Sequence, residues 1–168
     1  GQVVWNDVTK RMLGVMVRET FRKFGDGVDG WVVRTGETYV YDTPFHVGNS
    51  PSNGTMARWV EFITTLRDLV CVQHGKKLFM RAWDNWPSDT AYYLNMTTQI
   101  PVHPNLYFSV KHSAGDFVRP AVWNPTLGTG THAQIVEVEL QREYEGKGAV
   151  PNYVMAGVVD GFPEMGTR

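Results

Sequence analysis

The chain has 168 residues, of which 42% are hydrophobic and 20% charged, a composition that excludes a disordered protein. Its 16 Lys and Arg are balanced by 17 Asp and Glu, so no uniform basic field exists and we expect no nucleic-acid partner. No run of 18 apolar residues occurs, so we expect no membrane span. The single cysteine, Cys71, excludes an internal disulfide framework and a multi-cysteine metal site.

The first predicted element is a helix that Asn6 or Asp7 can cap and that Gly25 ends. Its apolar residues recur at helical spacing: Val8, Met12, Leu13, Met16, Val17, Phe21 and Phe24. A short strand is predicted from Trp31 to Thr35, followed by a long loop rich in Gly and Pro.

A second helix is predicted from about Thr55 to Val72, with Gly75 as its stop. One face of this helix is apolar and is formed by Trp59, Phe62, Ile63, Leu66, Leu69 and Val70. Cys71 falls within this apolar stretch, so we expect it to be a buried and unreactive thiol.

Three strands are predicted in the remaining sequence, after which the tail beyond Tyr144 is ambiguous. Leu78 to Ala82 is almost entirely apolar, as in a strand buried on both faces. A shorter helix is predicted to begin near Ser88 and Asp89, and the next strand from Leu106 to Lys111. A long loop without helical periodicity precedes the last strand, Gln134 to Leu140.

The alternation of helices and strands predicts an α/β fold with parallel strands and right-handed crossovers. Four such strands make about half of a TIM-type (β/α) barrel, which typically needs about 250 residues. An open doubly wound sheet fits the same order of elements. We find no repeat and no linker, so residues 1–168 are interpreted as a single, partial barrel domain with a catalytic role.

Each predicted strand is followed directly by charged or amide side chains. In parallel α/β folds the carboxyl ends of neighbouring strands share one face, and that face carries the chemistry. Carboxylates gathered there are suited to general acid and base catalysis of glycoside hydrolysis. Two other readings stay open, a hard metal site and carboxylates that only cap helices or face solvent, as for Asp84.

Several of these residues also resemble a known family. They are Lys111-His112-Ser113-Ala114-Gly115-Asp116-Phe117, Asn124-Pro125-Thr126-Leu127-Gly128, Glu137-Val138-Glu139-Leu140-Gln141-Arg142-Glu143-Tyr144-Glu145-Gly146, and the earlier Val33-Arg34-Thr35-Gly36-Glu37 and Arg81-Ala82. In order and near-equal spacing they resemble segments of the α-glucuronidases of glycoside hydrolase family 67. His112 stands where that family has Asn, and Arg119 is followed directly by Pro120, where the family has Arg-Glu-Pro.

The resemblance implies an inverting O-glycosyl hydrolase that removes glucuronic acid from xylan-derived oligosaccharides. The implied general acid is Glu37, and the candidate base residues are Asp116 and Glu143. The cations implied for binding the uronate carboxylate are Lys111, Arg81 and Arg34. The other expected substrate-binding residues are Trp83, His112 and Arg119. Of the remaining strand carboxylates, we expect Glu139 rather than Glu137 to substitute for a catalytic one.

The implied partners and location follow from the same reading. We expect an oligosaccharide or polysaccharide substrate, no cofactor, no bound metal and a secreted protein, with the remaining half of the barrel or a homo-oligomer as a further partner. Asn53 and Asn95 each begin a sequence acceptable for N-glycosylation. We expect His46, His74, His103 and His132 to lie in turns or at the surface. The alternative function is a non-catalytic carbohydrate-binding or structural relative.

Overall fold

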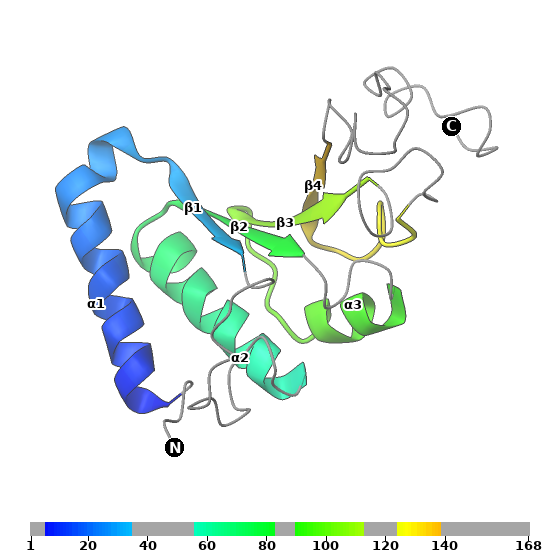
Figure 1. The fold of residues 1–168 in the computed structure, drawn as a ribbon, viewed down its shortest axis with the longest axis horizontal. Helices are drawn as coiled ribbons and strands as arrows, with labels where there is room; N and C mark the ends of the chain where they lie inside the picture. Colours follow the sequence, from blue (N-terminus) through cyan, green and yellow to red (C-terminus); the bar gives the residue numbers. More distant parts are fainter. Residues whose placement is uncertain (1–5, 35–55, 83–89, 113–123, 139–168) are drawn as a thin grey trace, which may run out of the picture.

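A computed structural model describes residues 6–34, 56–82, 90–112 and 124–138 (Figure 1). In chain order its helices and strands are α1 (Asp7–Phe24), β1 (Gly30–Arg34), α2 (Met56–Arg67), β2 (Lys77–Ala82), α3 (Thr90–Thr97), β3 (Leu106–Lys111) and β4 (Ala133–Glu137). A 3-10 turn, Gly25–Gly27, follows α1, and a π-helical segment, Asp68–Gln73, continues α2.

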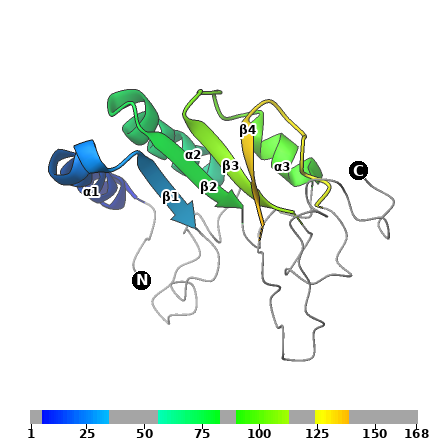
Figure 2. The ribbon, with the colours of Figure 1, turned by 90° about the horizontal axis from the view of Figure 1, so that it is seen from above.

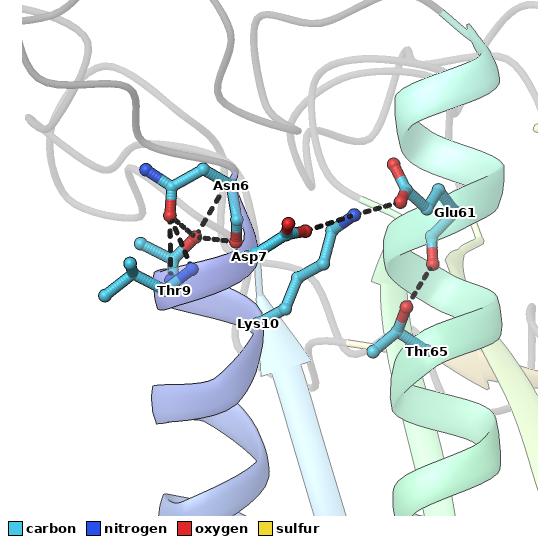
Figure 3. A network of polar contacts seen from close by, with 7 residues as sticks. Asn6, Asp7, Thr9, Lys10, Glu61 and Thr65 are labelled. Carbon is cyan, nitrogen blue, oxygen red and sulfur yellow. Dashed lines mark hydrogen bonds and ion pairs between the residues drawn. The ribbon is translucent and has the colours of Figure 1, made fainter.

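The start of α1 is fixed by a capping box. The side chain of Asn6 accepts hydrogen bonds from the backbone N–H groups of Val8 and Thr9, at 2.9 and 3.0 Å. The Thr9 hydroxyl in turn accepts the backbone N–H of Asn6 at 2.8 Å (Figure 3). These bonds satisfy donors that a helix start otherwise leaves unpaired. Lys10, one turn into α1, forms an ion pair with Glu61 of α2 and so joins the two helices.

The four strands form one parallel sheet in the order β1-β2-β3-β4. Gly30 begins β1 directly opposite Lys77 of β2. A Cβ at Gly30 would overlap the carbonyl oxygen of Lys77 and lie 2.9 Å from its carbonyl carbon and its Cβ. Glycine therefore allows β1 and β2 to approach closely at the point where their pairing begins.

The core lies between the sheet and the helices. Leu78, Met80, Leu106 and Phe108 of the two central strands are fully buried. Figures 1 and 2 show α2 and α3 together on one face of the sheet, with α1 beside α2 at the β1 edge. Among the described residues, no helix covers the opposite face.

The helix α1 contributes less to this core than its apolar content suggests. Of its large apolar residues, Val17 and Phe21 are buried, whereas Val8, Met12 and Met16 are each more than half exposed. Phe21 packs against Trp31 of β1 and against His74 after the π-helical segment, whereas the exposed residues, spaced four apart, share another face of the helix. The apolar stripe of α1 is thus wider than the surface that is covered.

The predicted α/β class is confirmed, as is the parallel arrangement of the strands. The apolar face of the second helix packs into the core as expected, with Trp59, Ile63 and Leu66 buried. His132 lies in a bend before β4, which the expectation allowed, but it is not at the surface, because its side chain is 6% exposed and packs edge-on against Phe108. Its ring is held inside by two hydrogen bonds from Nε2, to the carbonyl oxygens of Thr97 and Ile100.

Candidate functional site

Polar side chains gather on the sheet face opposite the helices, at the carboxyl ends of the strands. On β2, Leu78 and Met80 enter the core, so Phe79 and Arg81 point to the other face. Arg34 of β1 and Ser109 of β3 are the register partners of Arg81 and share its face. Lys111 of β3 and Glu137 of β4 are likewise partners on this face. We call Arg34, Arg81, Ser109, Lys111 and Glu137 the carboxyl-edge cluster.

An ion pair between Arg81 and Glu137 spans this cluster. Arg81 Nε donates to Glu137 Oε2 at 2.6 Å, and Arg81 Nη2 donates to Glu137 Oε1. The two side chains are 21% and 22% exposed, so the pair is largely withdrawn from water. Because Arg81 is on β2 and Glu137 on β4, the contact passes over β3 between them. A planar two-point contact of this kind fixes both charges in position.

The side chains of Lys111 and His112 are buried, although both were expected to bind the substrate. Lys111 is 3% exposed and His112 is 2% exposed. Both backbone polar groups of His112 are hydrogen-bonded. Its N–H donates to the Glu137 carbonyl oxygen, and its carbonyl oxygen accepts the N–H of Asn124, each at 3.0 Å. The end of β3 is therefore bonded both to β4 and to the turn that begins at Asn124.

The charges of the carboxyl-edge cluster are unequal. Its described members include three cations, Arg34, Arg81 and Lys111, and one carboxylate, Glu137, and each of the three cations takes part in further interactions. The forked donors of arginine match a carboxylate or phosphate in particular.

The sequence-predicted residues divide into two groups. Arg34, Arg81 and Lys111 are brought together on one face, as the shared carboxyl edge of parallel strands requires. His112 adjoins them in the sequence and is buried. The remaining predicted residues lie outside the described part of the chain, namely Glu37, Trp83, Asp116, Arg119 and Glu143.

Sequence reasoning missed the part that Glu137 plays in the cluster, having favoured Glu139, which lies outside the described residues. The available signal was the position of each residue at a strand end. Glu137 is the last residue of β4 and pairs with Lys111 of β3, and Arg81 is the last residue but one of β2 and pairs with Ser109 of β3. The ion pair itself had no signal, because contact between the first and third of three strands depends on the twist and on the side chains between them.

A second polar group missed by the sequence reasoning shapes the turn before β4. The Gln134 side chain donates to the carbonyl oxygens of Thr126 and Thr129, at 3.0 and 3.3 Å. Its Oε1 accepts the N–H of Gly128 at 2.8 Å. The Asn124 side chain accepts the N–H of Thr126 at 3.0 Å, a turn contact that Asn followed by Pro favours. These bonds have an architectural role, since Gln134 belongs to a different face from Arg81 and Glu137.

Cys71 is 2% exposed, as predicted from its place in an apolar helix. Burial away from water raises the pKa of its thiol to about 11, because the charged thiolate is disfavoured there. Its Sγ–H lies 3.5 Å from the carbonyl oxygen of Asn105. The thiol is therefore protonated at neutral pH and has a packing role.

The described residues define the class of this chain as an α/β protein whose four strands form one parallel sheet, with Arg34, Arg81 and Lys111 on one face at its carboxyl edge. Comparison with protein-family models, with curated proteins and with solved structures gives no match. None of the helices in the described ranges has the length and apolar character to cross a bilayer. Within the same ranges, no three or more His, Cys, Asp or Glu side chains are grouped to hold a metal ion.

Proposed function

We propose that this chain is the later part of a (β/α)-barrel glycoside hydrolase that removes a uronic acid of the glucuronate type from a plant-type polysaccharide or its oligosaccharides. The observation that carries the proposal is the meeting of Arg34, Arg81 and Lys111 on one face at the carboxyl edge of a parallel sheet. That edge is where α/β enzymes bind their substrates. Arginine and lysine side chains at that edge suit a sugar that carries a carboxylate.

The reaction assigned to this site is hydrolysis with inversion, and it rests on the resemblance to the α-glucuronidases. Glu37 is the proposed general acid, which protonates the leaving glycosidic oxygen. Asp116 or Glu143 is the proposed base, which takes a proton from the attacking water on the opposite face of the sugar. In the sequence these carboxylates follow β1, β3 and β4 respectively, and so come after the three strand ends that form the carboxyl edge. An inverting pair requires a separation of about 6.5–9.5 Å to admit the water.

Hydrolysis is tested with an oligosaccharide that carries one glucuronic acid side chain, and with the same compound after reduction of its carboxyl group to the neutral alcohol. We expect release of glucuronic acid from the first compound only, with the inverted anomer seen first by proton NMR. Asp116→Asn should remove turnover and retain binding. Equal release from both compounds would refute the role of the cationic edge, and unchanged turnover in Asp116→Asn would remove that residue from the mechanism.

A second candidate function is carbohydrate binding without hydrolysis. The observation in its favour is that Arg81 is already engaged by a carboxylate of the protein itself. Under this alternative the neutral and acidic oligosaccharides are both recovered intact, and the acidic one binds more tightly. Titration calorimetry with intact oligosaccharide, followed by analysis of the recovered sugar, separates this function from hydrolysis.

A further inference from the structure

The outer side of α1 carries apolar side chains that the fold leaves exposed. Val8, Met12, Val15 and Met16 are each more than half exposed. Their spacing of i, i+4, i+7 and i+8 places them along one side of the helix. We call these four residues the α1 stripe. Figure 1 shows α1 at the outer end of the helix layer, with α2 on one side of it and no described element on the other.

The α1 stripe points away from the sheet. Phe21 packs against Trp31 of β1, and Met12 stands nine residues before Phe21 in the sequence. Val17 is fully buried, and Val8 likewise stands nine residues before it. Nine residues make two and a half turns of an α-helix, so the two members of each pair lie on opposite sides of α1. A strand added beside β1 would extend the sheet and leave the α1 stripe on the outside of the helix layer.

Basic side chains flank the α1 stripe on both sides. Arg11 and Arg18, seven residues and so about two turns apart, line one side of it. Lys23 lies on the other side, seven residues after Met16. All three cations are exposed. Within the part of the chain that the structure describes, neither Arg11 nor Arg18 takes part in an ion pair.

The helix α1 is basic although the chain as a whole is not. It contains five Lys and Arg against two Asp and Glu, an excess of three positive charges, whereas the chain has a formal net charge of -1. The two carboxylates, Asp7 and Glu19, each lie within 4.0 Å of a cation of the same helix. A partner that complements this surface must therefore offer apolar material with negative charge on both sides of it.

We propose that the α1 stripe docks on the surface of an anionic lipid bilayer, with the helix lying in the plane of the interface. The apolar side chains enter the boundary between headgroups and acyl chains. Arg11, Arg18 and Lys23 extend to the lipid phosphate and carboxylate groups on either side. This proposal goes beyond the proposed function and does not rest on it.

Shape and charge favour a bilayer over a protein partner. The α1 stripe lies on the convex surface of a single helix, whereas an amphipathic helix of a partner is ordinarily bound in a groove. A second copy of the chain is opposed by charge. Antiparallel packing of two α1 helices about a two-fold axis brings the same side of both together, so their rows of Arg11 and Arg18 would repel. A bilayer presents headgroups to the cations on both sides at once.

Vesicle flotation with the full chain tests the proposal. We expect binding to vesicles of phosphatidylcholine with about 30% phosphatidylserine, about 100-fold weaker binding to phosphatidylcholine alone, and release at high salt. Arg11→Gln with Arg18→Gln should bind about 25-fold more weakly, because each cation at an anionic surface contributes about fivefold. Arg58→Gln with Lys77→Gln removes the same charge from other elements and should bind as the wild type does.

The apolar contribution is tested separately. Met12→Gln with Met16→Gln keeps the charge and the helix propensity of α1, and should bind about tenfold more weakly. A polarity-sensitive fluorophore attached to Met16→Cys should shift its emission to shorter wavelength when anionic vesicles are added, and the same label on Lys77→Cys should not. The label reaches only the introduced thiol in the native protein, because Cys71 is buried.

The outcomes decide between the bilayer and its alternatives. Binding that both double variants in α1 weaken, and that Arg58→Gln with Lys77→Gln retains, would support the proposal. A wild-type chain that does not float with anionic vesicles would overturn it, as would binding that is indifferent to Met12→Gln with Met16→Gln. Self-association seen by light scattering, lost in that same variant and without vesicle binding, would assign this side of α1 to a second copy and also overturn it. Release of glucuronic acid tests only the proposed function.

Discussion

The ion pair between Arg81 and Glu137 should stabilise the fold by linking β2 to β4, and a double-mutant cycle measures this directly. The cycle compares Arg81→Met, Glu137→Gln, the double variant and the wild type. Two unit charges about 4 Å apart at an effective dielectric constant near 20 attract by about 4 kcal/mol. The cost of removing both groups from water offsets part of this, and about a fifth of each side chain stays exposed. We therefore expect a coupling free energy of about 1.5–3 kcal/mol.

The assay is urea unfolding followed by tryptophan fluorescence, since the chain has six Trp. A matched control is the pair between Glu19 and Arg22 on α1, whose side chains are 48% and 66% exposed. Coupling in that pair should be much smaller and should vanish in 0.5 M salt, whereas the pair over β3 should keep most of its coupling. Equal coupling in the two pairs would refute the view that the contact over β3 is partly buried and fixed.

Three further results are expected. Gly30→Ala should lower the free energy of unfolding by about 1–3 kcal/mol, because its Cβ meets the backbone of Lys77, whereas Gly27→Ala, with open space around its Cβ, should have little effect in the same urea series. Asn6→Ala should cost about 1 kcal/mol through loss of the cap, with Asn6→Asp largely retaining stability. Cys71, with its pKa raised to about 11, should be about 0.1% thiolate at pH 8, so a thiol reagent should label it in urea and not in the native protein; rapid native labelling at pH 8 would contradict this burial.

The secondary structure was predictable wherever the signals are local. Both ends of the helix α1 were predicted: Asn6 caps its start through its side chain, and the α-helix ends before Gly25, where the chain continues as a 3-10 turn. The limits of β3 were also predicted in full, because an apolar run lies between the proline-containing turn before it and the charged residue Lys111 at its end. These features depend on contacts within a few residues, which a sequence displays directly.

What the sequence did not display depends on contacts between distant segments. His132 is buried because its ring reaches the carbonyl oxygens at the end of α3, more than thirty residues earlier, and no local pattern marks such a partner. The ion pair joins residues 56 positions apart and has the same origin. In α1 the periodicity of the apolar residues was evident in the sequence, but which of them would be covered depended on distant segments, such as Trp31 of β1 and His74, which contact Phe21.

The sequence was sufficient to predict where the candidate site lies, but not which of its side chains contact one another. Parallel strands bring their carboxyl ends to one edge whatever their side chains, so Arg34, Arg81 and Lys111 had to meet once the strands were placed in order. Which charges pair within that edge depends on the twist and register of the sheet and on the side chains between them, none of which the order of the strands fixes.

The sheet face that no described helix covers changes in character along the strands. Parallel sheets ordinarily bury both faces, but the described helices cover one of them. Toward the amino ends of the strands, the other face carries Val32, Phe79 and Tyr107, and the last two stack with ring centroids 5.2 Å apart. Two residues further along each central strand it carries Arg81 and Ser109. The apolar half suits packing against further protein, and Val32 there is 71% exposed, whereas in the charged half Lys111 is 3% exposed and the pair of Arg81 and Glu137 is about a fifth exposed, so those charges are already largely withdrawn from water.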